Sequence, residues 1–474
     1  MNPIDRRGFL DVCGKAGLGL AAGSAIAPGA HAQQGPQAPP PNIIFILLDD
    51  LGWTDLACCG SDLYETPNID LLARRGVRFT DAYSACTVCS PTRAAVMTGK
   101  YPARLHVTDW IHGHKRPNAP LSIPGWTEYL PLEETTIAEA LKLAGYATCH
   151  IGKWHLGYED RWPDKQGFDH NIGGYHRGQP PSYFSPYRIP TLEDGPEGEY
   201  LTDREAAEAC HFIESSRDRP FFLYLAHYGV HTPLQAKPDL VAHYNSRIRP
   251  GMRHTNARYA AMIHSVDESL GRITRKLQQL GLEDRTVIFF TSDNGGLVLW
   301  EVTDNWPLRA GKGSVYEGGV RVPLVVYWPG VTPQAATCRE PVSSVDFFPT
   351  MLDVAQCAPT AGTRDLDGKS LAPLLRRPRA ALDRDAIFWH YPHYHPGGAT
   401  PYGAIRQGPY KLVERYENMS VELHDLEQDI GQTRNLSDEQ PKRTKQLRNR
   451  LHDWRATVRA QMPTPNPDYK PAEG

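Results

Sequence analysis

The chain has 474 residues, of which 40% are hydrophobic and 22% are charged, and this composition is typical of a globular protein with a large core. Its formal net charge of −3 gives no electrostatic support for a nucleic acid or an anionic membrane as the partner. An anionic substrate would therefore need positive charge gathered locally at its site.

The first 32 residues have the pattern of an export signal. Arg6 and Arg7 precede an Ala- and Gly-rich run over 16–27, and Ala-His-Ala at 30–32 is typical of a cleavage site. The run is too short and too weakly apolar to cross a bilayer. The segment resembles a bacterial twin-arginine (Tat) signal, which implies the Tat export machinery as a partner, a periplasmic or extracellular location and no stable membrane anchor. A disordered basic tail is the alternative, and the Gln- and Pro-rich residues 33–41 are expected to be a linker.

Residues 42–375 alternate apolar runs with helix-like patterns. This alternation predicts an α/β catalytic domain with a large, mainly parallel sheet flanked by helices. Strands are predicted over 42–48, 147–151, 221–226, 286–291 and 322–328. Helices are predicted from Pro67 to Gly76, from the capping box of Thr136 and Glu139 to Gly145, and over 256–280.

The pattern changes after residue 375. Short β-like segments over 386–389, 402–406, 410–414 and 421–425 indicate an antiparallel sheet. A charged, helix-forming stretch follows over 438–459. Residues 376–474 are therefore expected to be a smaller C-terminal α+β subdomain with a frayed tail.

Chemically useful side chains follow four of the predicted strands. They are Asp49 and Asp50, Lys153 and His155, His227 and His231, and Asp293 and Asn294. Because ligands bind outside the carboxyl ends of the strands in open α/β sheets, these residues are expected to converge. The three aspartates and the asparagine offer oxygen ligands, which suit one Ca²⁺ ion better than Zn²⁺ or Mg²⁺.

Cys89 lies in a second informative segment. Ser90 is expected to cap a helix that starts at Pro91 and stops at Gly99, so that Cys89 would precede a helix N-terminus, where an anion is favoured. An unmodified Cys89 could be a low-pKa thiolate nucleophile there. Cys86 and Cys89 also form a single C-x-x-C, which is weak evidence for redox chemistry or half a zinc site.

The segment C-S-P-T-R at 89–93, followed by T-G-K-Y-P at 98–102, resembles the signature of the type I sulfatases of the alkaline-phosphatase-like superfamily. Further segments that resemble this family lie at 48–52, 152–155, 231–233, 292–295, 308–313, 317–319, 405–412 and 423–426. One departure, at 429–432, replaces a turn that often contains Asp-Pro in the family. The resemblance covers nearly all of the chain after the linker and implies a sulfuric ester hydrolase.

The resemblance also implies a cofactor and a maturation partner. Cys89 would be oxidised to formylglycine (3-oxoalanine) by a formylglycine-generating enzyme, and the hydrated aldehyde would attack sulfur and later release sulfate. The calcium ion would be held by Asp49, Asp50, Asp293, Asn294 and the modified residue 89.

The resemblance gives the remaining catalytic residues separate roles. Arg93 and Lys153 would hold the hydrated aldehyde and the sulfate group through charge-assisted hydrogen bonds. His155 would assist the release of sulfate from residue 89. His231 and Lys312 would bind sulfate and protonate the leaving oxygen.

The substrate is expected to be a sulfated carbohydrate that contains galactose-type units. The enzyme is expected to remove sulfate from the end of the carbohydrate chain (exo action). The sequence between the motifs contains aromatic- and His-rich stretches over 104–118, 173–187, 300–306 and 389–395, which suit contacts with sugar rings. Arg104, His106, Asp109, His227 and His393 are the predicted substrate-binding residues.

Two other functions are compatible with the motifs. The first is a phosphonate monoester or phosphodiester hydrolase of the same superfamily, although such relatives tend to have Asp-His where this chain has Asp293-Asn294. The second is a sugar-binding protein with an inactive site, which requires that Cys89 is never oxidised.

Overall fold

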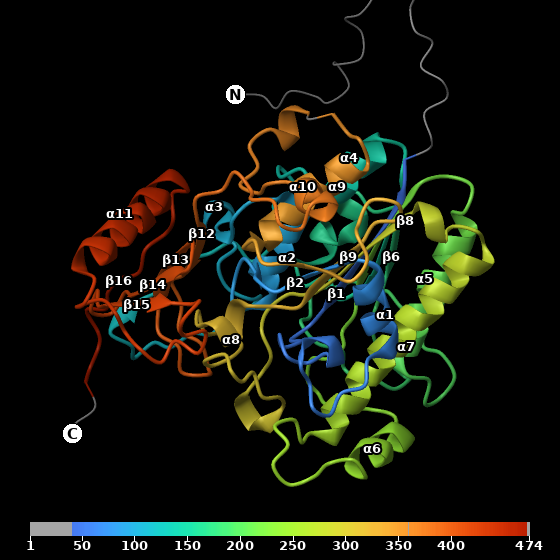
Figure 1. Ribbon diagram of the computed structural model, residues 1–474, viewed down its shortest axis with the longest axis horizontal. Helices are drawn as coiled ribbons and strands as arrows, with labels where there is room; N and C mark the ends of the chain where they lie inside the picture. Colours follow the sequence, from blue (N-terminus) through green and yellow to red (C-terminus); the bar gives the residue numbers. More distant parts are fainter. Residues whose placement is uncertain (1–39, 359, 472–474) are drawn as a thin grey trace, which may run out of the picture. The chain divides into compact units, whose positions relative to one another are not determined.

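The computed structural model describes residues 40–358 and 360–471 (Figure 1). The predicted export signal over 1–32 and most of the linker lie outside these residues. Within them, no helix is both long and apolar enough to cross a membrane.

An eight-stranded sheet forms the centre of the molecule, in the order β10-β2-β9-β8-β1-β7-β5-β6. Its strands are β1 (Asn42–Leu48), β2 (Val77–Phe79), β5 (Ala147–Gly152), β6 (His170–Ile172), β7 (Phe221–Ala226), β8 (Thr286–Ser292), β9 (Leu324–Tyr327) and β10 (Ala336–Cys338). Only β9 pairs antiparallel with its neighbours in this sheet. The prediction of a mainly parallel sheet is confirmed, with all five predicted strands in it.

Helices cover both faces of the sheet, which explains why β1 is apolar at every position after Asn42. Ile44 and Ile46 point into one hydrophobic cluster, whereas Ile43 and Phe45 point into another, as the alternation of side chains along a strand requires. The first cluster includes side chains of α1 (Pro67–Arg75), α5 (Leu201–Ser215) and α7 (Ala257–Gln279), with α6 (Pro238–Asn245) packed on α7. The second includes side chains of α2 (Cys89–Thr98), α3 (Pro102–Leu105), α4 (Ile137–Leu143), α9 (Phe347–Val354) and α10 (Ala372–Arg376).

Two predicted helix starts are confirmed by side-chain caps, and one is wrong. The Thr136 hydroxyl accepts from the Glu139 N–H and the Glu139 carboxylate accepts from the Thr136 N–H, which completes the capping box of α4. Asn256 caps α7 by accepting from two N–H groups of its first turn. Helix α2, however, begins at Cys89 and not at Pro91, and Val88 is its N-cap. Ser90 is not a cap because its hydroxyl donates to the His155 carbonyl at 2.9 Å.

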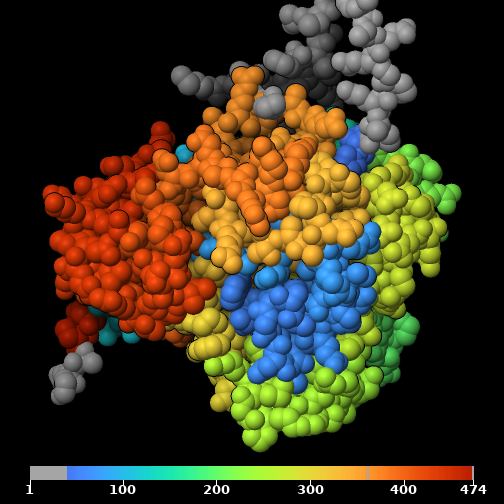
Figure 2. Space-filling view, viewed as in Figure 1, coloured from blue at the N-terminus to red at the C-terminus, as the bar shows by residue number. Residues whose placement is uncertain are grey.

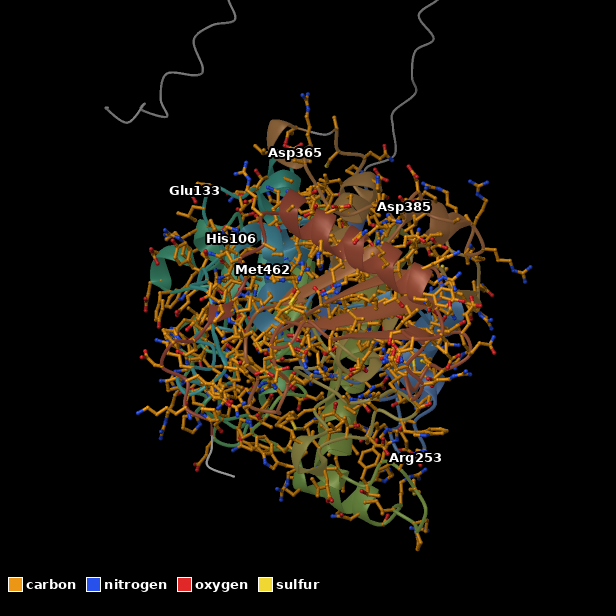
Figure 3. The ribbon with its side chains drawn as sticks, turned by 90° about the vertical axis from the view of Figure 1, so that its left-hand side faces the viewer. His106, Glu133, Arg253, Asp365, Asp385 and Met462 are labelled. Atoms are coloured by element: carbon orange, nitrogen blue, oxygen red, sulfur yellow. The ribbon has the colours of Figure 1, made fainter. Side chains whose placement is uncertain are left out.

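The C-terminal part contains a four-stranded antiparallel sheet in the order β12-β13-β14-β15. The strands are β12 (Ile387–Tyr391), β13 (Tyr402–Gln407), β14 (Tyr410–Arg415) and β15 (Val421–Asp425). Helix α11 (Pro441–Thr457) lies across one face of this sheet, where Leu447 and Leu451 pack on Leu412 (Figure 3). Trp389 and Val413 pack in a cluster with Val88, the residue before Cys89, so the small sheet supports the start of α2.

Short elements complete the fold. They are the pairs β3 (Ala82–Tyr83) with β11 (Val342–Ser343) and β4 (Leu121–Ser122) with β16 (Thr464–Pro465), and the single-turn helix α8 (Glu317–Val320).

Candidate active site

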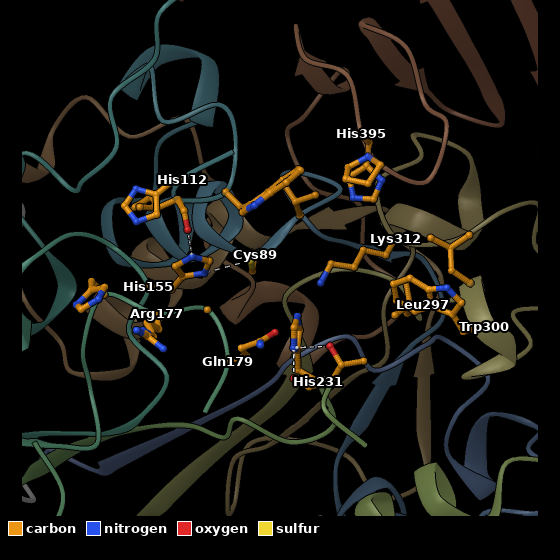
Figure 4. A pocket seen from close by; sticks show the side chains of 18 residues that line it. Cys89, His112, His155, Arg177, Gln179, His231, Leu297, Trp300, Lys312 and His395 are labelled. Carbon is orange, nitrogen blue, oxygen red and sulfur yellow. Dashed lines mark hydrogen bonds between the residues drawn. The ribbon is translucent and has the colours of Figure 1, made fainter. Parts of the chain in front are cut away.

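Four neighbouring strands of the central sheet deliver their polar residues to the same edge. Strands β5, β7, β1 and β8 are adjacent and parallel, so that their carboxyl ends lie together. The residues delivered there are Asp49 and Asp50 after β1, Lys153 and His155 after β5, His231 after β7, and Asp293 and Asn294 after β8. Figure 4 shows Cys89, His155, His231 and Lys312 around one space.

Cys89 lies at the first turn of α2 and is buried. Its Sγ atom is 3.3 Å from Nδ1 of His155. Burial raises the pKa of the Cys89 thiol, and the positive charges of Lys153 and Lys312 do not reverse this effect. An unmodified Cys89 would therefore be a neutral thiol at neutral pH, and the thiolate interpretation is not supported.

The orientation of His155 is fixed from both sides. Its Nε2–H donates to the carbonyl of Ile111 at 2.5 Å, which leaves Nδ1 free to accept a proton from position 89. Burial, and then the positive charge of Lys153, lower the pKa of His155, so its ring is neutral. A Cβ atom at Gly178 would lie 2.5 Å from the ring of His155, and this close approach explains the glycine.

Arg93 and Lys153 are fully buried and bind the aspartates. Nε and Nη2 of Arg93 donate to Oδ2 of Asp293 at 3.0 and 2.8 Å. Nζ of Lys153 donates to Oδ2 of Asp49 at 2.6 Å. Burial, and then the negative charge of Asp49, raise the pKa of Asp293 to about 6. The four side chains of Arg93, Lys153, Asp49 and Asp293 are thus held together by buried ion pairs.

Asp50 binds residues on the opposite side of the site. Its carboxylate accepts from Nζ of Lys312 at 2.8 Å and from Nδ2 of Asn294 at 2.7 Å. Burial alone would raise the pKa of Asp50, but Lys312 and then His231 bring it below its ordinary value. His231 donates from Nδ1 to the Thr232 carbonyl, and burial and Lys312 lower the pKa of His231 to about 3.

Two buried oxygen atoms in this site have no hydrogen-bond donor. They are Oδ1 of Asp49 and Oδ1 of Asn294. Ligand atoms of Asp49, Asp50 and His231 also lie within 4.8 Å of one another. Because an unsatisfied buried oxygen costs free energy, a cation bound here would stabilise the site. Carboxylate and amide oxygens are the ligands that Ca²⁺ prefers, so the donors present fit the predicted ion.

A cavity of about 590 Å³ opens above these residues. Cys89, His155, His231 and Lys312 line it, in agreement with their predicted positions. Its other polar or aromatic lining residues are Trp110, His112, His176, Arg177, Gln179, Thr232, Trp300 and His395. All of these except Thr232 belong to the four aromatic- and His-rich stretches over 104–118, 173–187, 300–306 and 389–395, but none was among the predicted substrate-binding residues.

None of the five predicted substrate-binding residues lines this cavity. Arg104 binds Asp367 through two hydrogen bonds of 2.9 and 2.6 Å. His106, labelled in Figure 3, donates to the Arg459 carbonyl at 3.1 Å. His393 is buried and bonds to the Thr108 hydroxyl at 2.8 Å.

The other two predicted substrate-binding residues are buried beside the site. Asp109 accepts from the Tyr391 hydroxyl at 2.7 Å and from the Trp110 N–H at 2.9 Å, and burial raises its pKa to about 8. His227 bonds to Glu205 at 2.5 Å through Nδ1 and to Ser269 at 3.0 Å through Nε2. Both therefore have structural partners, and the contacts that occupy them could not be read from the sequence.

Substitution of His227 by alanine is expected to reduce stability and not substrate affinity. The change leaves the buried Glu205 without its partner, which is expected to lower the free energy of unfolding by about 2–4 kcal/mol. Urea unfolding measures this effect. His243→Ala is a matched control, because the His243 side chain is 41% exposed and its loss is expected to cost less than about 1 kcal/mol. A large rise in KM without destabilisation would contradict the structural role.

Comparison with known proteins identifies the family of this chain. A family model described as Sulfatase matches residues 41–357. The chain belongs to the sulfatase family. A second model, described as N-sulphoglucosamine sulphohydrolase, C-terminal, matches residues 310–460 of this sulfatase.

Relatives extend over most of the chain. A sulfatase of Formosa agariphila is 33% identical and aligns with 87% of this chain and 88% of its own. The N-acetylgalactosamine-6-sulfatase of Homo sapiens is 34% identical over 76% of this chain and 70% of its own. The solved structure of Ps i-CgsB has a TM-score of 0.75 at 31% identity and covers 91% of this sulfatase and 94% of its own chain. This sulfatase is thus a sulfuric ester hydrolase with the alkaline-phosphatase-like fold.

Proposed function

We propose that this sulfatase removes a sulfate ester from a carbohydrate, with a formylglycine formed at Cys89 and one calcium ion. The observation that carries the proposal is the cavity, whose floor is formed by Cys89, His155, His231 and Lys312 and whose wall contains aromatic and basic side chains. Solved relatives support a carbohydrate, since one structure is of Ps i-CgsB with k-i-k-neocarrahexaose.

The chemistry divides between the modified residue, the ion and the chain. Hydrated formylglycine would supply a hydroxyl nucleophile for sulfur, and a calcium ion held by Asp49, Asp50, Asp293 and Asn294 would supply positive charge. Nδ1 of His155 lies where it accepts a proton from a group on residue 89. Asp293, whose pKa is raised toward neutrality, is the second candidate proton acceptor.

The substrate sulfate would lie between the cations of the site. Lys312 bears a proton in the free site, because Asp50 raises its pKa against the effect of burial. His231 is neutral there, because burial and the positive charge of Lys312 lower its pKa. We therefore assign sulfate binding to Lys312 and His231. We also assign protonation of the leaving oxygen to this pair, of which Lys312 is the residue that already carries a proton before substrate binds.

The cavity also limits the substrate. Its volume of about 590 Å³ is within the usual range for one small ligand, which favours a terminal sugar and exo action. The similarity to an N-acetylgalactosamine-6-sulfatase supports a galactose-type unit. Export through the Tat machinery to the periplasm or beyond, and oxidation of Cys89 by a formylglycine-generating enzyme, complete the proposal.

Sulfate release tests the proposal. Mature protein, produced together with a formylglycine-generating enzyme, is incubated with galactose-type and glucose-type monosaccharides sulfated at defined positions. An aryl phosphonate is included as the substrate of the alternative hydrolase. Release from one positional isomer of a galactose-type sugar supports the proposal, whereas faster turnover of the phosphonate would contradict it.

Trp300 is expected to bind the sugar. It lines the cavity and is 79% exposed, which suits stacking on a sugar ring. Trp300→Ala is expected to raise KM about tenfold and change kcat less than about twofold, because the ring contacts ground state and transition state equally. Trp306→Ala is the control, since Trp306 is 56% exposed, lies outside the cavity lining and stacks with Arg253. Equal KM values for both variants would show that Trp300 does not contact substrate.

A further inference from the structure

A second basic surface lies along the edge strand β10. A groove of about 1010 Å³ is lined by Arg78, Arg339, Arg377 and Arg379, and a smaller one of about 320 Å³ is lined by Arg74 and Arg78. Residues 335–337, which lie in β10 and directly before it, line both grooves. The two grooves together are called the edge groove. In Figure 2 the blue N-terminal segment adjoins the yellow-orange to orange segments on the face shown. The edge groove shares no lining residue with the cavity at Cys89.

The positive charge of the edge groove is not neutralised by the chain. Within residues 40–358 and 360–471, no carboxylate lies within 4.0 Å of the guanidinium group of Arg74, Arg78, Arg339, Arg377 or Arg379. Other arginines of the chain do form ion pairs, such as Arg75 with Glu283 and Arg204 with Glu208. The two carboxylates in the lining, Glu340 and Asp70, accept from other groups. Glu340 accepts from the Leu382 N–H at 3.1 Å, and Asp70 from the Cys58 N–H at 3.0 Å. The lining therefore contains five arginines and two carboxylates, whereas the net charge of the whole chain is −3.

The lining determines which anion fits. Guanidinium groups bind sulfate through paired N–H donors, and several in a row suit an anion that repeats along a chain. Thr80 and Thr337 add hydroxyl groups, while Pro333 and Pro378 provide rigid apolar surface between the arginines. Among the residues that the structure describes, no aromatic side chain lines either groove, although stacking on aromatic rings is a main contact of proteins that bind single-stranded nucleic acid.

We propose that the edge groove binds a sulfated polysaccharide away from the active site. The inference rests on the proposed function, because a carbohydrate sulfatase encounters such a polymer as substrate. Binding at the edge groove would hold the polymer on the enzyme and so raise the effective concentration of its sulfate groups. The hydrolysis of a sulfated monosaccharide does not require the edge groove.

Matched variants test the proposal. Arg339→Gln, Arg377→Gln and Arg379→Gln are combined in one protein, and Arg188→Gln, Arg258→Gln and Arg275→Gln in a control. All six side chains belong to exposed residues, and the control positions lie outside the edge groove. Binding of dextran sulfate, dextran, polygalacturonate and a single-stranded oligodeoxynucleotide is measured by calorimetry at about 150 mM salt, where long-range attraction is screened. Thermal unfolding checks that both variants are folded.

The groove variant is expected to lose at least about tenfold in affinity for dextran sulfate, while the control changes less than about twofold. Dextran and polygalacturonate are expected to bind weakly to all proteins. Equal losses in both variants, equal binding of polygalacturonate, or tighter binding of the oligonucleotide would overturn the proposal. Turnover of a sulfated monosaccharide is measured in parallel and reports only on the cavity at Cys89. Loss of this turnover in all proteins would contradict the proposed function, whereas loss of polymer binding alone concerns the edge groove.

Discussion

Cys89→Ala abolishes sulfate release, with a loss in kcat/KM of about 10⁴-fold or more, while the protein remains folded. The expected size reflects the removal of the nucleophile, which the other groups of the site cannot replace. Cys89 is a small buried residue at the first turn of α2, and alanine is compatible with a helix at that position. Sulfate release from the substrate identified in the monosaccharide assay measures the effect.

Cys86→Ala is the matched control for this experiment. Cys86 is also buried and lies three residues earlier, but its pKa is raised by burial to about 12 and it does not line the cavity. We expect this variant to retain activity within about threefold and to lose about 1 kcal/mol of stability. If both cysteines were equally necessary, a redox or zinc role of the C-x-x-C would replace the formylglycine interpretation. A peptide mass for residue 89 that is lower than that of cysteine would support oxidation directly.

Removal of calcium is expected to have the second largest effect. Chelation lowers kcat/KM by about 10³-fold, because the positive charge that activates the nucleophile and neutralises sulfate is lost. It also lowers Tm by about 5–10 °C, since an ion that binds only the folded state stabilises it. The structural reason is the pair of buried oxygen atoms without a hydrogen-bond donor, Oδ1 of Asp49 and Oδ1 of Asn294, which a bound cation would satisfy.

Titration of the chelated protein with metals provides the control. Calcium is expected to restore both activity and Tm, whereas magnesium restores little, because it binds such a protein cage poorly. Asn294→Ala is expected to raise the calcium concentration needed for half of the Tm increase, since it removes the unpaired oxygen Oδ1. A chelated protein with unchanged Tm and activity would exclude the proposed ion.

The sequence predicted well those features that depend on neighbouring residues. The apolar run of β1, the capping box at Thr136 and the helix over 256–280 have local patterns, and the structure contains all three. Strands β2, β6 and β10 were not predicted, because three residues are too few to show an alternating pattern. Ser90 looked like a cap for the same local reason, but its hydroxyl bonds to the backbone of His155, which is remote in sequence.

Which residues line the cavity depended on tertiary structure. A stretch rich in His and aromatic residues can be found in the sequence, but which of its side chains point into a cavity depends on the contacts of the others. Asp109 and His393 are held by Tyr391 and Thr108, whereas His112 and His395 from the same stretches line the cavity. The sequence by itself determined the family motifs and the strand ends on which they lie. Only the tertiary structure decided which loop residues line the cavity, because their orientation comes from packing between segments far apart in the chain.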